Sequence, residues 1–395
     1  MPGEDRHDRF KKYPLNICDT TLRDGEQAAG IVFANLEKIR IAKLLDELRI
    51  QQLEVGIPAM GGDEKKAIKR IARLGLNTSL LGWNRASIED ISHSIDCDLD
   101  AVAVSMSSSD IHIEHKLRKN REWVLERMVE SIEYAKDHGL YVSANAEDAS
   151  RSDKEFLIQF TQTAKEAGAD RLRYCDTLGV LEPRRAFDTI KVLVDYVKIP
   201  VEMHTHNDFG MATANAIAGI RGGATFASTT VLGIGERTGN SPLEEVVMAA
   251  KHLLNMDTGI DTPRFREIAE YVARAAGRAI PAWKPIVGDN CFAHEAGIHT
   301  DGVLKFLSNY EPYSPEEVGM CRKIIIGKHS GRSTIKQVLS SGGISVDDES
   351  AMVILEIVRK TSISLKRSLS ENELIYIYHD WKDGIFETLE ENVEE

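Results

Sequence analysis

The chain reads Val201-Glu202-Met203-His204-Thr205-His206-Asn207-Asp208 directly after Pro200, as a short strand that runs into a polar end. Because alternate side chains of an extended chain point the same way, His204 and His206 share one face. Two imidazoles on one face are half of a divalent-metal site, which an Asp or Glu from elsewhere can complete. The plainer interpretation is a pair of solvated or core histidines, since His-x-His is a common pattern.

Short β-rich segments alternate with amphipathic stretches before and after this pair. The β-rich segments are Leu15–Asp19, Gln52–Ile57, Thr78–Gly82, Ala101–Met106, Tyr141–Ala146, Arg171–Cys175, Val201–His204 and Phe226–Leu232. Alternation of this kind predicts parallel strands joined by helical crossovers. Eight such units favour a closed (β/α)8 TIM barrel over an open doubly wound sheet. No Gly-x-Gly-x-x-Gly follows the first segment, which argues against a Rossmann fold.

The barrel pattern ends near Arg278, where a segment with two prolines and a glycine begins at Pro281. We therefore expect a catalytic barrel over residues 14–278. Residues 279–395 are then a linker and a smaller, mostly helical C-terminal region. Within that region the apolar periodicity predicts a helix over residues 348–367.

Composition limits the classes of function. The 395 residues are 42% hydrophobic without a long apolar run, which predicts a soluble protein with a large core. A formal charge of −13 and a pI near 5.5 argue against nucleic acid or an anionic membrane surface as a partner. Five cysteines without a Cys-x-x-Cys pair predict reduced thiols and a cytoplasmic protein. The polar segment Met1–Pro14 lacks the apolar core of a secretory signal.

Polar residues follow most of the predicted strands, and barrel enzymes place their chemistry at those strand ends. They are Asp19–Gln27, Glu54, Asn145–Asp148 with Arg151, Asp176 with Thr177, the histidine pair, and Glu236–Asn240. Each of these residues alone is as readily a helix cap or a surface charge. A polar barrel mouth built from so many strands instead predicts a ligand site.

A hard divalent cation prefers a carboxylate, imidazoles and an amide or water oxygen. Asp24, His204, His206 and Asn240 would form such a shell with open positions, which are typical of a catalytic site. This donor set accepts Mg²⁺, Mn²⁺, Fe²⁺ or Zn²⁺. Arg23 lies beside Asp24, where a guanidinium can polarise a carbonyl or bind a carboxylate.

Three motifs carry a family resemblance. They are Asp19-Thr-Thr-Leu-Arg-Asp-Gly-Glu-Gln27, His204-Thr-His-Asn-Asp208 and Gly233-Ile-Gly-Glu-Arg-Thr-Gly-Asn240. Together they resemble the metal-dependent barrel synthases that condense acetyl-CoA with a 2-oxo acid, namely the isopropylmalate, citramalate and homocitrate synthases. The resemblance covers roughly residues 14–335.

Within that family the chain most resembles homocitrate synthases of the nitrogen-fixation type. One reason is Gly56-Ile-Pro-Ala-Met-Gly61 after the second strand. The other is length: isopropylmalate synthases usually add a leucine-sensing domain, and the residues after Gly331 are too few for one.

The resemblance implies roles for individual residues. Asp24, His204 and His206 match the metal ligands, and Asn240 matches a fourth ligand or near-ligand. Arg23 matches the arginine at the keto carbonyl, and Arg151 and Thr177 match residues that hold the oxo acid. The catalytic histidine of the family matches His299, with Glu147 and Tyr310 as helpers. In the family this histidine comes from the second subunit of a domain-exchanged dimer, so we expect a homodimer.

One region departs from the family pattern. Homocitrate synthases of lysine biosynthesis carry a histidine after the third strand that touches the distal carboxylate of 2-oxoglutarate. This chain reads Gly82-Trp83-Asn84-Arg85 there, so Asn84 or Arg85 is expected to take over the contact. The basic segment from Lys328 to Arg332 either meets the CoA phosphates or, as the favoured interpretation, is a solvated loop.

The expected reaction is a Claisen condensation of acetyl-CoA with 2-oxoglutarate to homocitrate and CoA. Isopropylmalate or citramalate synthase, with the same chemistry and another oxo acid, is the nearest alternative. A hydroxymethylglutaryl-CoA-type lyase shares the barrel and the histidine pair, but the cysteine expected in its glycine-rich loop is absent between Gly233 and Asn240. A non-catalytic metal-binding barrel predicts gaps in the set of site residues, and the sequence shows none.

Overall fold

The computed structural model describes residues 7–385, so the start of the polar segment Met1–Pro14 and the last ten residues lie outside it. The chain divides into two compact units, Met1–Ile280 and Pro281–Glu395. The expected boundary was residue 278. Among the described helices, none combines the length and apolar character that a membrane span requires.

The first unit is a closed parallel barrel in which each strand pairs with the next and β8 pairs with β1. Its strands are β1 (Asn16–Asp19), β2 (Gln52–Gly56), β3 (Ser79–Arg85), β4 (Ala101–Ser107), β5 (Tyr141–Glu147), β6 (Arg171–Asp176), β7 (Val201–Thr205) and β8 (Phe226–Thr229). The predicted (β/α)8 TIM barrel is confirmed. The eighth strand ends at Thr229, earlier than expected, because Val231–Gly233 forms a 3₁₀ turn in which Leu232 has a φ of 61°.

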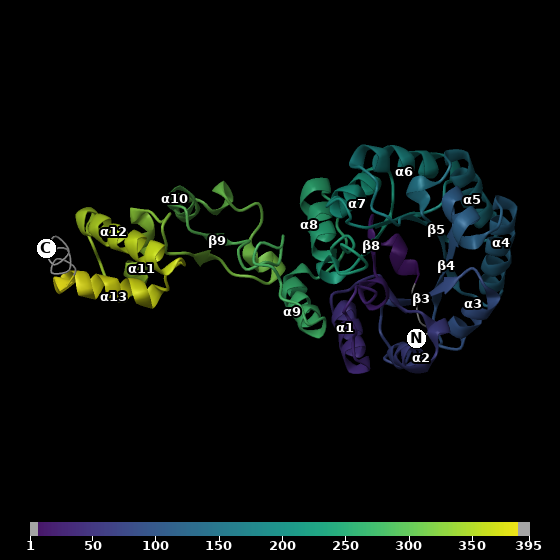
Figure 1. Cartoon of the computed structure of the whole chain (residues 1–395), viewed down its shortest axis with the longest axis horizontal. Helices are drawn as coiled ribbons and strands as arrows, with labels where there is room; N and C mark the ends of the chain where they lie inside the picture. Colours follow the sequence, from purple (N-terminus) through teal and green to yellow (C-terminus); the bar gives the residue numbers. More distant parts are fainter. Residues whose placement is uncertain (1–6, 386–395) are drawn as a thin grey trace. The chain divides into compact units, whose positions relative to one another are not determined.

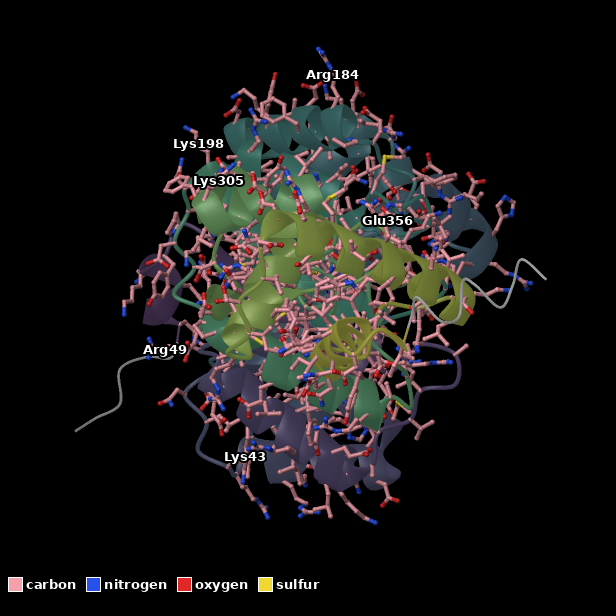
Figure 2. All side chains as sticks on the ribbon, turned by 90° about the vertical axis from the view of Figure 1, so that its left-hand side faces the viewer. Lys43, Arg49, Arg184, Lys198, Lys305 and Glu356 are labelled. Carbon is pink, nitrogen blue, oxygen red and sulfur yellow. The ribbon has the colours of Figure 1, made fainter. Side chains whose placement is uncertain are left out.

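Helices cover the outside of the strands in chain order (Figure 1). They are α1 (Asn35–Glu47), α2 (Gly62–Ala72), α3 (Ile88–Ile95), α4 (Arg121–Asp137), α5 (Lys154–Glu166), α6 (Pro183–Val197), α7 (Ala212–Arg221), α8 (Leu243–Leu254) and α9 (Phe265–Ala275). Each buries one apolar stripe, as α1 does with Ile41 and Leu45. Burying a leucine or isoleucine side chain contributes about 1.5–3 kcal/mol. Figure 2 shows the opposite faces, where charged side chains such as Lys43 and Arg184 project into solvent.

Charged residues occupy the barrel interior below the mouth. Arg171 and Arg173 point inward from β6 and are fully buried. Both pair with Glu202 of β7, at 2.7 Å and 2.9 Å, and Arg173 also donates to Glu54 at 2.5 Å. Burial disfavours the charged guanidinium, but Glu202 and Glu54 hold the pKa of Arg173 well above its ordinary value. An ion network therefore fills space that is apolar in many barrels.

The second unit has its own apolar core, formed by α11 (Arg332–Ser341), α12 (Asp348–Leu365) and α13 (Glu371–Lys382). Ser370 and Glu373 form a capping box at the start of α13. A two-stranded parallel sheet, β9 (Ala293–His294) with β10 (Lys323–Ile324), and α10 (Gly297–Lys305) precede these helices. The expected mostly helical C-terminal region is confirmed, and its predicted helix over 348–367 corresponds to α12.

Candidate active site

The barrel mouth brings Asp24 next to the histidine pair. Asp24 lies in a tight turn, η2 (Thr21–Gly25), whose start is held by Thr20 accepting a hydrogen bond from the Asp24 backbone N–H. Its Oδ2 lies 3.5 Å from Nε2 of His204 and 3.8 Å from Nε2 of His206. One ligand atom from each residue lies within 4.8 Å of the others, and all three side chains are buried.

Two buried oxygens at this cluster lack a hydrogen-bond partner within residues 7–385: Oδ2 of Asp24 and Oδ1 of Asn240. Buried oxygens are normally paired, so an orphaned carboxylate oxygen facing two imidazoles fits a cation. Asn240 reaches the cluster because its backbone pairs with His206 and its Nδ2 donates to the Ile234 carbonyl at 3.2 Å. The four predicted ligands are thus brought together, and their donor set fits a divalent metal.

The protonation states also fit metal binding. Burial would raise the pKa of Asp24, but Arg23, His204 and His206 together hold it well below its usual range. Burial lowers the pKa of His204 well below its ordinary value, and the attraction of Asp24 does not offset this. Burial also lowers the pKa of His206. The site therefore presents an ionised carboxylate and neutral imidazoles, which are the forms that ligate metals.

Arg23 lies between the metal ligands and the buried ion network. Its Nη1 donates to Oδ1 of Asp24 at 2.8 Å, and its Nε donates to Glu54. Glu54 in turn binds Arg173. The Trp83 ring lies 5.9 Å from the guanidinium carbon. These contacts hold the guanidinium rigidly at the mouth, where a carbonyl or carboxylate would meet it.

A cavity of about 150 Å³ opens at this point. Its walls are Arg23, Asp24, Gln27, Trp83, Ser105, Asn145, Glu147, Arg173, Cys175, Thr177, His204, His206 and Glu236. Glu147 accepts hydrogen bonds from Ser107 at 2.8 Å and from Lys116 at 2.6 Å. Thr177 accepts one from the Asp148 backbone at 2.8 Å. The predicted residues Arg23, Glu147 and Thr177 therefore share one cavity with the candidate metal ligands.

The structure places Asn84 and Arg85 outside this cavity. Asn84 is buried against α3, where it accepts a hydrogen bond from Ser94 at 2.8 Å and donates to the Gly82 carbonyl at 2.9 Å. Arg85 lies at the end of β3 and forms a bidentate pair with Asp90. Successive strand residues face opposite sides, so Trp83 lines the cavity and Asn84 faces the helices.

Arg151 also lies outside the cavity walls. It belongs to the short turn η5 (Ala149–Arg151), and its guanidinium binds the buried Asp148 at 2.7–3.0 Å. Sequence reasoning missed Trp83, Ser105 and Arg173 of the cavity walls, and it missed Ser228, whose Oγ contacts the ring of His204. The period-two alternation along β3, β4, β6 and β8 is the signal that would have placed them inside.

His299 and Tyr310 belong to the second unit, where they lie side by side. Their rings are 4.3 Å apart, centroid to centroid, with a tilt of 31°. His299 is exposed on α10, and Tyr310 is 41% exposed. Ile298, Phe306 and Leu307, which are close to these two residues in sequence, are exposed apolar side chains. The segment from Ile298 to Tyr310 therefore exposes apolar side chains together with a histidine and a tyrosine.

Family models match nearly the whole described chain. The HMGL-like model covers residues 14–272, and a model described as "Homocitrate synthase post-HMGL domain-like" covers residues 286–364. "2-Isopropylmalate synthase 2" of Caldanaerobacter subterraneus subsp. tengcongensis is 58% identical over 372 residues, 94% of this chain and 97% of that protein. "Homocitrate synthase 1" of Nostoc sp. is 51% identical over 91% of this chain and 95% of its own length. An (R)-citramalate synthase of Methanocaldococcus jannaschii is 45% identical over 93% of this chain and 74% of its own length.

Solved structures agree with the fold. A hydroxymethylglutaryl-CoA lyase of Bacillus subtilis superposes with a TM-score of 0.62 at 19% identity, covering 68% of this chain and 96% of that one. The carboxyl transferase domain of Rhizobium etli pyruvate carboxylase gives a TM-score of 0.56 at 18% identity, covering 70% of this chain and 52% of that one. At these identities the likeness extends to the barrel fold alone.

Fold, site and sequence identity define a class. The chain belongs to the HMGL-like family of (β/α)8 barrels and, within it, to the isopropylmalate, citramalate and homocitrate synthases, which condense acetyl-CoA with a 2-oxo acid. The expected homocitrate type is not singled out by these relatives, because an isopropylmalate synthase is the more similar of the two to this chain.

Proposed function

We propose that the protein is a homocitrate synthase that condenses acetyl-CoA with 2-oxoglutarate. The observation that carries the reaction class is the orphaned Oδ2 of Asp24, which faces His204 and His206 beside the guanidinium of Arg23. A divalent cation bound there supplies Lewis-acid polarisation of the keto carbonyl. Arg23 adds a fixed positive charge where the alkoxide develops on carbon 2.

The remaining roles belong to side chains of this protein. His299 is the proposed base that removes a methyl proton from acetyl-CoA, and such help contributes about 10²–10⁴ in rate. Glu147, with Lys116 beside it, and Tyr310 are the proposed helpers. The enolate attacks the keto carbon, and water then cleaves the thioester to release CoA and the hydroxy acid. Thr177 and Arg151 are the proposed contacts of the oxo-acid carboxylate.

The choice of 2-oxoglutarate is supported by the wall of the cavity. Trp83, Ser105 and Asn145 line it from β3, β4 and β5 and carry an indole N–H, a hydroxyl and an amide. Such donors suit a second carboxylate better than an isopropyl group, which would leave them unpaired. These three residues replace Asn84 and Arg85 as the proposed distal contacts.

Isopropylmalate synthase is the second candidate, because the 58%-identical relative carries that name. A thiol-release assay with 2-oxoglutarate, 3-methyl-2-oxobutanoate and pyruvate separates the two. We expect the highest kcat/KM with 2-oxoglutarate. A preference for 3-methyl-2-oxobutanoate would contradict the homocitrate assignment and leave the condensation chemistry in place. If none of the three acids supported thiol release, the proposed function itself would be contradicted.

The role of His299 is tested separately. We expect His299→Ala to retain metal and oxo acid and to lose turnover, whereas the matched variant His138→Ala, at a histidine on the outside of the barrel, stays active. Unchanged turnover in His299→Ala would remove this histidine from the mechanism. Metal content by mass spectrometry and oxo-acid binding by calorimetry show whether the variant keeps its barrel site.

We further propose a domain-exchanged homodimer in which His299 serves the barrel of the partner. The exposed apolar side chains Ile298, Phe306 and Leu307, close to this histidine in sequence, support docking onto another protein surface. Mixing inactive Arg23→Gln and His299→Ala subunits should then restore activity to about a quarter of wild type, since hybrid dimers assemble one intact site. An inactive mixture that forms hybrid dimers would contradict the exchange.

A further inference from the structure

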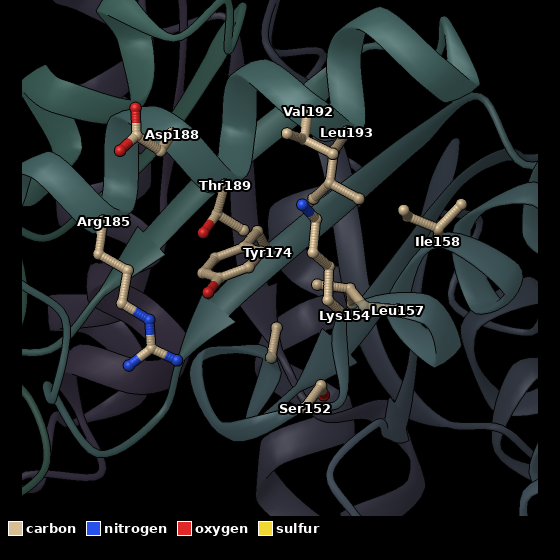
Figure 3. A pocket seen from close by; sticks show the side chains of 11 residues that line it. Ser152, Lys154, Leu157, Ile158, Tyr174, Arg185, Asp188, Thr189, Val192 and Leu193 are labelled. Atoms are coloured by element: carbon tan, nitrogen blue, oxygen red, sulfur yellow. The ribbon is translucent and has the colours of Figure 1, made fainter.

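A second cavity of about 240 Å³ lies on the outside of the barrel between α5 and α6. Its floor is Tyr174 of β6, and its sides come from the two helices and the turn that precedes α5 (Figure 3). At about 30 Å³ per water, a space of this size is large for one or two ordered waters. None of its lining residues belongs to the cavity of the candidate active site.

The Tyr174 hydroxyl supplies a polar group at the floor of this cavity. The side chain is only 1% exposed and lines the cavity, and no hydrogen bond joins its hydroxyl to another residue within residues 7–385. The hydroxyl is not among the fully buried polar atoms that lack a partner, so it faces the open space of the cavity, where a ligand can exchange a hydrogen bond with it. Figure 3 shows the phenol lying between the two helices, with Thr189 above it.

Two cations stand at the rim of the cavity. Lys154, the first residue of α5, has no ion pair or side-chain hydrogen bond among the described residues. Arg185 of α6 donates one N–H to the Ser150 carbonyl at 2.6 Å. The one acid of the rim, Asp188, lies 3.6 Å from Arg184 on the same helix. The rim therefore has a net positive charge on a protein whose total charge is −13, which favours an anion.

The walls between these polar groups are apolar. Leu157 and Ile158 face the cavity from α5, and Val192 and Leu193 face it from α6. An inorganic anion would leave these side chains without contacts. An aliphatic chain with a carboxylate at one end satisfies both the apolar walls and the polar rim.

We propose that this cavity binds a small aliphatic carboxylate and that its occupant changes the affinity of the active site for the oxo acid. Ala149 lines the cavity and belongs to η5, the turn that carries Arg151. Arg185 holds the carbonyl of Ser150 in the same turn. An occupant thus contacts the segment that positions Arg151. The change in affinity for the oxo acid rests on the proposed function, whereas binding of the carboxylate to this cavity does not.

Binding is tested by calorimetric titration of the full-length protein with sodium 4-methylpentanoate. We expect saturable binding at one site per chain. The neutral isostere 4-methylpentan-1-ol should bind about 10- to 100-fold more weakly, because it lacks the charge-assisted hydrogen bonds. Acetate should bind at least about tenfold more weakly, because it lacks the apolar body. Equal binding of the alcohol would overturn the assignment to a carboxylate.

Variants locate the site. Tyr174→Phe keeps the ring and removes only the unpaired hydroxyl, so we expect about 2- to 12-fold weaker binding. Lys154→Gln should also weaken binding, whereas Lys43→Gln, which removes one exposed charge from α1, should not. Wild-type affinity in both cavity variants would overturn the proposal. Loss of binding in Arg23→Gln would do the same, because it would assign the probe to the barrel mouth.

Coupling between this cavity and the active site is measured as the KM of the preferred oxo acid with and without 4-methylpentanoate. We expect the probe to change KM in the wild type and to have a smaller effect in Tyr174→Phe. An equal effect in both proteins would indicate competition at the barrel mouth and overturn the coupling. An unchanged KM at saturating probe would overturn it as well. If none of the oxo acids supported thiol release, the proposed function would be contradicted. The calorimetric titration would still decide whether the cavity binds the carboxylate.

Discussion

Oγ of Ser228 lies 3.0 Å from Nδ1 of His204, deep in the barrel mouth. The contact fixes the ring so that Nε2 faces Asp24. Metal-binding histidines commonly have such a partner on the nitrogen that does not ligate. Ser228 extends the site to β8, although no motif in the sequence marks it.

We predict that Ser228→Ala weakens divalent-metal affinity about 10- to 100-fold, the range found for partners of ligating histidines. His204→Ala should lose the metal and the activity altogether. Ser341→Ala, at an exposed serine of α11, serves as control. Affinity is measured by competition with a chelator of known strength. A fully active, metal-free His204→Ala protein would refute the metal site, and wild-type affinity in Ser228→Ala would remove Ser228 from it.

We predict that Gly239→Ala also weakens metal binding, by displacing Asn240. Gly239 has a φ of +92°, and a Cβ there would lie 1.9 Å from the carbonyl oxygen of Gly233. The loop therefore has to move. Gly277→Ala is the matched control, since Gly277 also has positive φ, at +62°, but a Cβ meets nothing within 4 Å. The free energy of unfolding of Gly277→Ala should fall only by roughly 1–2 kcal/mol, which is the cost of placing an alanine in the left-handed conformation. Equal metal affinity in both variants would show that Asn240 does not ligate.

Glu54→Gln tests the buried ion network. Glu54 is fully buried and binds both Arg23 and Arg173, so its loss leaves cations short of a partner. Removing one member of a buried pair costs about 3–5 kcal/mol, which should appear as a lower free energy of unfolding in urea. The KM for the oxo acid should rise as well, because Arg23 loses its support. Glu126→Gln, on the exposed face of α4, should change neither quantity.

We predict that Asp19 makes the free energy of unfolding depend on pH. Burial raises the pKa of its carboxyl to about 7. The folded state thus binds this proton more tightly than the unfolded chain, whose Asp has a pKa near 3.9. The resulting stabilisation is full below the unfolded pKa and disappears as the pH rises through about 7. Asp19→Asn stays neutral, so its stability relative to wild type should increase by up to about 4 kcal/mol between pH 4 and pH 8.

Urea unfolding of both proteins at several pH values, with chelator present to exclude metal binding, measures this difference. The amide oxygen of the Asp19→Asn variant would still accept the hydrogen bond from the Thr21 backbone N–H, which the native carboxylate accepts at 2.9 Å. A difference between the two proteins that does not vary with pH would show that Asp19 is ionised in the fold throughout.

The sequence by itself determined the barrel and the residues of the candidate metal site. Alternation of apolar strands and amphipathic helices is a local property, because each element has to bury one face whatever its neighbours are. Asp24, His204, His206 and Asn240 were recognisable for the same reason, since each lies in a short polar motif at a strand end.

Only the tertiary structure decided which side chains meet. Strand closure and register bring Ser228 to His204 and Glu54 to Arg173, and no local pattern encodes those distances. The pleat of β3 turned Trp83 into the cavity and Asn84 away from it. The cavity between α5 and α6 likewise exists only once two helices pack over Tyr174. Side-chain contacts between distant segments depend on how the chain closes on itself, and that is a property of the whole fold.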